Sequence, residues 1–538
     1  MHRRNLILFL VIVLITLLST AGLYGVMESS DARYAEIGRE MYNSGDLLHP
    51  DLLDVHHYHK PPLTYIITAL GYQLFGSTPF GARFFLQLAL LLQLLLVYKL
   101  TLLLFDNKKT ALWAAVIYFG FPIVLISSRN LTTDAYLTTF VLASLVSWVA
   151  YRKQGRLFWL YTFTLALGLG FLTKGPVVFI VPLPFILLYN RIEKAKHKIT
   201  YHHFFAWMLF LIVAASWFVY LVIENSLFLD YFLGRQTVDR FSENAFGRTE
   251  PFWYFLAFSP LVGLPWFLIL IYLIKLNWKH FSKRSIYSVF LITGIIVLLF
   301  FSISSSKRIL YILPLYSLLA VLSAQLLAVS SESTRKRILM IVTTFLSLIA
   351  IAFVVVPFIK IDFDIPVFLP VSGVIVLVLA FALVKSVPVK NCDKAVFLTF
   401  LTGILLLSGS SIFFSRNELR VNASAPVTRF IIENQLNKRE VLVYNTRKSS
   451  IAFGLNKSIV SLNNGDKSLA RETQFETDAN WRKYLIDLRK AEEVKYLKFV
   501  MEKPTVLLVY KYPVDEKNLW LLSYYTNKKE MGKWTIYY

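Results

Sequence analysis

The chain has 538 residues, of which 56% are hydrophobic and only 17% are charged, whereas a soluble domain is about 25% charged. Its net charge of +23 lies largely in short loops, where membrane topology and anionic head groups explain it better than a nucleic-acid partner. The single cysteine, Cys392, excludes an intrachain disulfide and a cysteine metal cluster. The composition therefore indicates a polytopic α-helical membrane protein.

The first apolar run predicts a membrane span from about Asn5 to Val26. It is too long for the apolar region of a signal peptide, so we interpret it as a retained span. Arg3 and Arg4 precede it and predict a cytoplasmic N-terminus. The polar loop that follows is then expected on the outer side of the membrane.

This first loop contains two short apolar segments. Ala32, Ile37 and Met41 alternate with charged residues, which predicts an amphipathic interfacial helix that ends near Gly45. After Pro61-Pro62, the segment LTYIITALGYQLFG is too short to span, so it predicts a second interfacial or re-entrant helix.

Further apolar runs bring the expected total to about 13 transmembrane helices. Each loop assigned to the inside carries clustered Lys or Arg, which places the C-terminus outside. We expect a transmembrane domain over residues 1–414, with periplasmic loops 27–80 and 224–251. Residues 415–538 are more polar and predict a separate periplasmic domain.

The tail alternates helical and strand patterns, which predicts an α/β domain. The segments APVTRFIIENQLNK and NWRKYLIDLRKAEEVKYLKFVME are expected as helices. The segments EVLVYN, PTVLLVYK and KWTIYY are expected as strands. This domain contains no glycine-rich nucleotide-binding fingerprint.

By this topology, ionisable side chains gather at one membrane face, which marks a candidate functional site. Cations there can hold a membrane-tethered phosphate, and a carboxylate can deprotonate an acceptor. The set comprises Asp31, Arg33, His56, His57, His59, Lys60, Asp134, Lys174, Arg235, Asp239, Arg240, Arg248, Lys307, Arg308 and Tyr311.

Several motifs along the chain resemble those of GT-C integral membrane glycosyltransferases. They are DARYAEIGREMYNSGDLLHP, HKPPLTY, TTDAYLT, LTKGP, the pair Arg240-Phe241 followed by PFWYF, and KRILYILPLY. The chain is most similar to the lipid A aminoarabinose transferases, which are related to the protein O-mannosyltransferases. The resemblance implies a GT-C fold and sugar transfer from a polyprenyl-phosphate donor at the periplasmic face of the bacterial inner membrane.

The resemblance also implies roles for individual residues. Asp31, just before Ala-Arg-Tyr, corresponds to the expected catalytic base. Lys60, Arg240 and Tyr311 correspond to positions that hold the lipid phosphate, and Arg33 and Lys174 are further candidates. His59 and Asp134 correspond to positions near a divalent metal, which could be zinc, magnesium or manganese. Relatives often carry acids where this chain has Ser30 and His59, so Glu28 is an alternative base.

Each candidate also has a structural interpretation. Asp31 and Asp134 can cap helices, Arg33 can pair with Glu28 or Glu36, and Lys60 and Tyr311 can be interface anchors. Lys174 can simply end a helix, and His59 can be hydrogen-bonded without a metal.

The leading functional hypothesis is transfer of a sugar to lipid A or another envelope glycolipid. A protein O-glycosyltransferase is the alternative enzyme. A lipid or solute transporter fits less well, because the polar residues lie at one face instead of the midplane.

Overall fold

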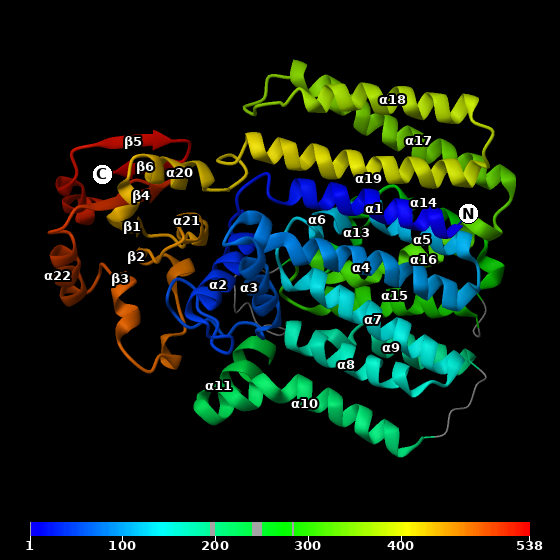
Figure 1. Cartoon of the computed structure of the whole chain (residues 1–538), viewed down its shortest axis with the longest axis horizontal. Coiled ribbons are helices and arrows are strands. Elements are labelled where there is room, and N and C mark those ends of the chain that lie inside the picture. The colour runs from blue at the N-terminus through cyan, green and yellow to red at the C-terminus, as the bar shows by residue number, and fades with distance from the viewer. Residues whose placement is uncertain (1, 194–198, 239–249, 282–284) are drawn as a thin grey trace. The chain divides into compact units, whose positions relative to one another are not determined.

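The computed structural model describes residues 2–193, 199–238, 250–281 and 285–538 (Figure 1). The chain forms two compact units, each described here by itself. Unit 1 comprises Met1–Thr20, His59–Leu63 and Leu86–Ile412, and unit 2 comprises Ala21–Tyr58, Thr64–Phe85 and Phe413–Tyr538. Most of the first loop thus groups with the tail, and the predicted domain boundary at residue 414 stays a prediction.

Ten of the described helices are long and apolar enough to cross a membrane. They are α1 (His2–Ala21), α4 (Pro79–Phe105), α7 (Thr133–Gln154), α8 (Leu157–Lys174), α10 (Tyr201–Glu224), α15 (Ile286–Ile303), α16 (Leu313–Val329) with the preceding turn η4 (Ile309–Ile312), α17 (Glu332–Val355), α18 (Phe368–Ser386) and α19 (Asn391–Arg416). The chain is therefore a multi-pass membrane protein.

Three of the expected spans are broken helices, so the expected count of about 13 is not confirmed. One is α13 (Tyr254–Val262) and α14 (Trp266–Leu276), which bend by 102° and would make an eleventh span among the described residues. The others are α5 (Lys108–Phe119) with α6 (Pro122–Ser127), and η1 (Pro176–Phe179) with α9 (Pro182–Ile192). Each break falls at a proline, which cannot continue the hydrogen bonding of the preceding helix.

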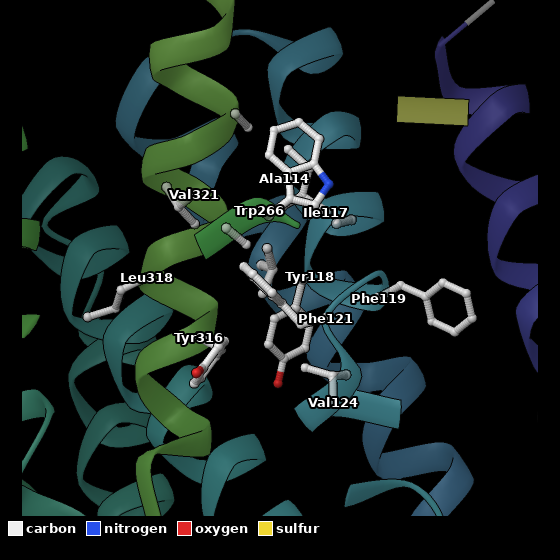
Figure 2. Close-up of a cluster of buried hydrophobic side chains, with 14 of the residues drawn as sticks. Ala114, Ile117, Tyr118, Phe119, Phe121, Val124, Trp266, Tyr316, Leu318 and Val321 are labelled. Carbon is white, nitrogen blue, oxygen red and sulfur yellow. The ribbon is translucent and has the colours of Figure 1, made fainter. Parts of the chain in front are cut away.

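The core of unit 1 includes a cluster of buried aromatic and aliphatic side chains (Figure 2). The rings of Phe121 and Tyr316 meet edge to face with centroids 5.0 Å apart. The Tyr316 hydroxyl donates a 2.7 Å hydrogen bond to the Ser259 carbonyl. The Trp266 indole N–H donates a 2.9 Å hydrogen bond to Thr399 Oγ1. Such hydrogen bonds are directional, so they fix the rotation of each helix about its axis.

The tail forms a six-stranded sheet of order β3-β2-β1-β4-β6-β5. Its strands are β1 (Glu440–Tyr444), β2 (Val460–Asn463), β3 (Leu485–Asp487), β4 (Thr505–Tyr510), β5 (Lys528–Met531) and β6 (Trp534–Tyr537). The first four strands in the order run parallel, and β6 and β5 add an antiparallel edge. Residues 505–509 of the central strand β4 are all buried, as expected for a sheet covered on both faces.

The predicted α/β tail is confirmed, with one correction to its elements. Helices α20 (Ala425–Glu433), α21 (Ser449–Leu455) and α22 (Ala491–Val500) flank the strands in sequence. The helix expected from Asn480 is wrong in its first half, which forms the short turn η9 (Asn480–Lys483) and then β3. The pairing of β3 with β2 outweighs the helical pattern there. The two strands are distant in sequence, so a local pattern does not reveal this pairing.

Both short helices of the first loop form in unit 2. Helix α2 (Ser30–Ser44) ends at Gly45, whose φ of 75° is the left-handed conformation that glycine adopts readily. Eleven of its fifteen residues are buried, so α2 is more enclosed by protein than an interfacial helix is expected to be. It packs closely on α3 (Leu63–Phe75), since a Cβ on Gly38 would lie 2.8 Å from Thr68 Cγ2.

Candidate active site

Asp134 and Lys174 form an ion pair at one end of the α7–α8 hairpin in unit 1. Asp134 is in the first turn of α7, after the N-cap residue Thr132, and Lys174 is the last residue of α8. The tight turn at Gly155, with φ of 68°, makes the helices antiparallel, so these two ends meet. Lys174 Nζ contacts Asp134 Oδ1, and the two side chains are only 7% and 9% exposed. Burial of such a pair is costly, because both charges lose their hydration. Buried ionisable residues in membrane proteins usually mark functional sites.

Tyr311 joins this pair from a different part of unit 1. It lies in the turn η4, directly before α16. Lys174 Nζ lies 4.3 Å from the centroid of the Tyr311 ring, a cation–π distance. Three residues predicted at one membrane face thus meet, although they come from segments that are far apart in the chain. We refer to Asp134, Lys174 and Tyr311 as the lysine site.

The other predicted site residues are placed as follows. His59 and Lys60 are half-buried in unit 1, just before α3, and the His59 ring lies 6.5 Å from the Tyr231 ring. Arg33 is half-buried in α2 of unit 2, with its guanidinium 5.5 Å from the Tyr34 ring centroid. The predicted phosphate ligand Arg240 lies outside the described residues.

Lys307 is a second buried lysine in unit 1, in the turn between α15 and η4. Its Nζ donates hydrogen bonds of 2.8 Å to the Glu250 carbonyl and 2.6 Å to the Ser304 carbonyl. Burial lowers the pKa of Lys307, and the nearby Glu250 partly opposes that effect. The carbonyls orient this ammonium, so Lys307 supports the turn that leads to Tyr311.

Asp31 lies at the start of α2 and is bound by Arg83, a residue that the sequence analysis did not single out. Arg83 Nη2 donates a 2.5 Å hydrogen bond to Asp31 Oδ2, and both side chains are buried. Arg83 also donates 3.0 Å hydrogen bonds to the carbonyls of Ala21, Tyr24 and Gly25. It therefore ties the end of α1 to the start of α2. The Asp31 carboxylate is thus engaged in a buried ion pair at the start of α2.

Arg129, two residues after the end of α6, is another buried arginine that the sequence analysis did not single out. Its guanidinium donates to Gln87 Oε1 at 2.8 Å and to Ser411 Oγ at 3.2 Å, and it contacts Thr20 Oγ1. These partners lie on α4, α19 and α1 of unit 1. The signal available for both Arg83 and Arg129 was a lone arginine within or beside an apolar run.

A cluster of buried acids lies further along the first loop, within unit 2. The Glu40 carboxylate accepts hydrogen bonds from the backbone N–H groups of Leu53 (2.7 Å) and Asp54 (3.2 Å), whose positive φ angles turn both groups toward it. Asp54 Oδ1 accepts a 2.8 Å hydrogen bond from Ser458 Oγ in the tail. Arg39 binds Glu36 through bonds of 2.8 and 2.6 Å. Burial raises the pKa of Glu40 well above its usual range, and that of Asp54 to about 6.

Replacing Asp54 with Asn is expected to stabilise the protein at neutral pH but not in acid. Because the pKa of folded Asp54, about 6, exceeds the unfolded value of 3.8, its ionisation costs stability progressively as the pH rises between these values. The cost at pH 7.5 is about 1–3 kcal/mol. In thermal unfolding of the detergent-solubilised protein, the midpoint of Asp54→Asn should lie above that of wild type at pH 7.5. This difference should vanish near pH 4. A constant difference across this range would contradict the shifted pKa.

Candidate metal ligands occur in both units. In unit 2, His57 and Glu472 are buried and offer ligand atoms within 4.8 Å of each other. In unit 1, the predicted ligand Asp134 already has the Lys174 ammonium beside it. An ammonium neutralises the carboxylate and repels a metal cation, so the donor set around Asp134 fits a metal poorly.

Comparison with known proteins supports the resemblance seen in the motifs. Residues 59–220 match the family model described as dolichyl-phosphate-mannose-protein mannosyltransferase. The undecaprenyl phosphate-alpha-4-amino-4-deoxy-L-arabinose arabinosyl transferases of Aeromonas hydrophila and Pectobacterium carotovorum are 33% and 31% identical over 297 and 337 residues. These matches cover 54% and 62% of this chain, and 54% and 61% of the relatives. The chain thus spans little more than half the length of these curated relatives.

The crystal structure of ArnT from Cupriavidus metallidurans bound to undecaprenyl phosphate matches 99% of this chain and 97% of its own, with a TM-score of 0.79 at 18% identity. The chain has the GT-C fold of ArnT. The resemblance stated from the motifs is thereby confirmed for the fold, including the tail. The apo structure of ArnT matches equally well, with a TM-score of 0.78. Among the described residues, the lysine site gathers three of the predicted site residues.

Proposed function

We propose that the protein transfers a sugar from a polyprenyl-phosphate donor to lipid A or another envelope glycolipid, at the periplasmic face of the bacterial inner membrane. The curated relatives are named for arabinosyl transfer from undecaprenyl phosphate, and the ArnT crystal structure holds undecaprenyl phosphate. In this proposal the N-terminus is cytoplasmic, and the tail, residues 415–538, is periplasmic. The clustered Lys and Arg residues of the inner loops support that orientation.

The observation that carries the proposal is the lysine site. In the transfer, the bond between the anomeric carbon and the phosphate oxygen breaks, and its electron pair leaves with the lipid phosphate. An oxygen of the acceptor forms the new bond to that carbon. A buried ammonium stabilises the charge that develops on the phosphate, and Lys174 is such a group. Asp134 and Tyr311 hold its ammonium in place before the donor arrives.

The Asp31–Arg83 ion pair favours an acceptor that is already ionised. A serine or threonine hydroxyl must lose its proton during transfer, which requires an available base. A phosphate acceptor carries negative charge at neutral pH and needs no such base. Since Arg83 engages the Asp31 carboxylate, a phosphate group of lipid A is the acceptor that this arrangement suits best. Asp31 as the catalytic base remains part of the proposal for a hydroxyl acceptor.

The remaining predicted roles belong to the same proposal. Arg33, Lys60 and Arg240 supply further cations for the lipid phosphate. The proposal also includes a divalent metal at His59 and Asp134, which would have to compete with the Lys174 ammonium for Asp134. Metal analysis of the purified protein, with and without chelator, tests it directly.

A protein O-glycosyltransferase is the second candidate, because the family model that matches residues 59–220 is described by a protein acceptor. One experiment separates the two. Purified protein is given an undecaprenyl-phosphate sugar together with either lipid A or a serine- and threonine-rich peptide. We expect transfer to lipid A. Transfer to the peptide alone would favour the second candidate, and flux of the donor without turnover would contradict both.

A further inference from the structure

The segment between α1 and α2 is held by the tail, within unit 2. The Gly25 N–H donates a 2.7 Å hydrogen bond to Glu418 Oε1, which is buried. The Glu28 N–H donates a 2.9 Å hydrogen bond to the Asn422 carbonyl, and Met27 forms an antiparallel bridge with Ala423. The tail thus adds a short strand-like contact to the first loop, next to the start of α2.

The Glu28 carboxylate extends this contact into the tail. Glu28 Oε1 accepts a 2.8 Å hydrogen bond from the backbone N–H of Ser450 in α21. The Ser450 hydroxyl donates a 2.8 Å bond to Ser424 Oγ. Burial raises the pKa of Glu28, whereas the Ser450 N–H and the charge of Lys448 lower it.

Lys448 is itself fixed by aromatic rings. Its Nζ lies 3.4 Å from the Tyr510 ring centroid and 5.6 Å from that of Trp534, and its side chain is buried. The Tyr510 hydroxyl donates a 2.9 Å hydrogen bond to Asn422 Oδ1, on the residue whose carbonyl holds the Glu28 N–H. The receiving side of the contact therefore holds a buried cation against two aromatic rings.

On its other side the same segment leads directly to Asp31. The Met27 N–H donates a 3.0 Å hydrogen bond to Asp31 Oδ2, and the Ala32 N–H donates a 2.9 Å bond to the Met27 carbonyl. Asp31 in turn binds Arg83. Displacement of Met27 and Glu28 would therefore displace the first turn of α2.

We propose that Glu28 is a positioning residue, through which the tail holds the first turn of α2 in the geometry that sugar transfer requires. The tail is then a working part of the transferase. This inference rests on the proposed function for its kinetic consequence, but the coupling itself depends only on contacts within unit 2. Gln in place of Glu28 keeps an acceptor for the Ser450 N–H and loses the charge, whereas Ala loses both.

The test uses full-length protein in detergent with three variants. They are Glu28→Ala, Glu28→Gln and Glu516→Ala, the last at an exposed glutamate of the same unit. Hydrogen exchange measured by mass spectrometry should become faster in Glu28→Ala over residues 25–33 and 448–452. Its kcat should fall about 10- to 100-fold, with KM for the donor changed less than about threefold. In both exchange rate and kcat, Glu28→Gln should lie between Glu28→Ala and wild type, and Glu516→Ala should match wild type.

Two results would overturn the proposal. Unchanged exchange in both segments would show that Glu28 does not couple the tail to α2. Faster exchange with wild-type kcat per folded molecule would show a contact that supports structure without positioning the reaction. If wild type itself showed no turnover with any polyprenyl-phosphate sugar, the proposed function would fail, while the exchange data would still decide the coupling.

Discussion

Lys174→Met is expected to lower kcat/KM for the polyprenyl-phosphate sugar by about 100- to 1000-fold, because it removes the buried cation that the proposal assigns to the leaving phosphate. Lys174→Arg keeps the charge with a different shape, and should retain part of the activity. Lys336→Met, at an exposed position in unit 1, is the matched control and should match wild type. Steady-state kinetics with labelled donor in detergent provides the measurement.

In Lys174→Met, the Asp134 carboxylate stays buried without the Lys174 ammonium, so a loss of activity could result from a loss of folding. The double variant Lys174→Met with Asp134→Asn removes both charges and avoids that cost. It should unfold at a temperature near that of wild type and remain as inactive as Lys174→Met. Near-normal turnover in the folded double variant would mean that the ion pair only supports the hairpin.

Arg83→Met is expected to destabilise the protein by about 3–5 kcal/mol, because it leaves the Asp31 carboxylate buried without its guanidinium. It also removes the donors to three carbonyls at the end of α1. Thermal unfolding in detergent should show a markedly lower midpoint for Arg83→Met, and little change for Arg482→Met at an exposed site of unit 2.

A second substitution shows whether the loss comes from the ion pair. Adding Asp31→Asn to Arg83→Met removes the unpaired charge, so it should recover a substantial part of the stability. If the double variant is no more stable than Arg83→Met, the Asp31 charge is not what Arg83 compensates.

The placement of Asp134, Lys174 and Tyr311 at one membrane face could be predicted from sequence, because each residue carries a local signal, but the contacts of Lys174 with the other two could not. Asp134 and Lys174 each lie at the end of an apolar run, and Tyr311 lies at the start of one. A topology built from apolar lengths and basic loops then places all three at one face.

The partner of Asp31 could not be predicted in this way. Arg83 is 52 residues further along the chain, at the start of a different apolar run. Whether a carboxylate is open or ion-paired depends on tertiary contacts, which the motif before Ala-Arg-Tyr does not encode. The same holds for Glu28, whose partner Ser450 is 422 residues away.

The errors in the fold have a similar cause. Strands β2 and β3 contain four and three residues, too few for a periodic pattern, and they form because parallel neighbours pair with them. The helices α13 and α14, which are divided at Pro265, together have enough apolar residues to cross a membrane. Hydropathy counts such residues, but it does not register where a proline divides the helix.

Mass spectrometry of lipid A and envelope glycans tests the central claim most directly. The cells lack their own copy of the protein and are complemented with either wild type or the Lys174→Met, Asp134→Asn double variant. The account predicts a sugar added to lipid A, or to another envelope glycolipid, with wild type and its absence with the double variant. An unchanged glycolipid profile together with a wild-type-dependent sugar on a protein would contradict it.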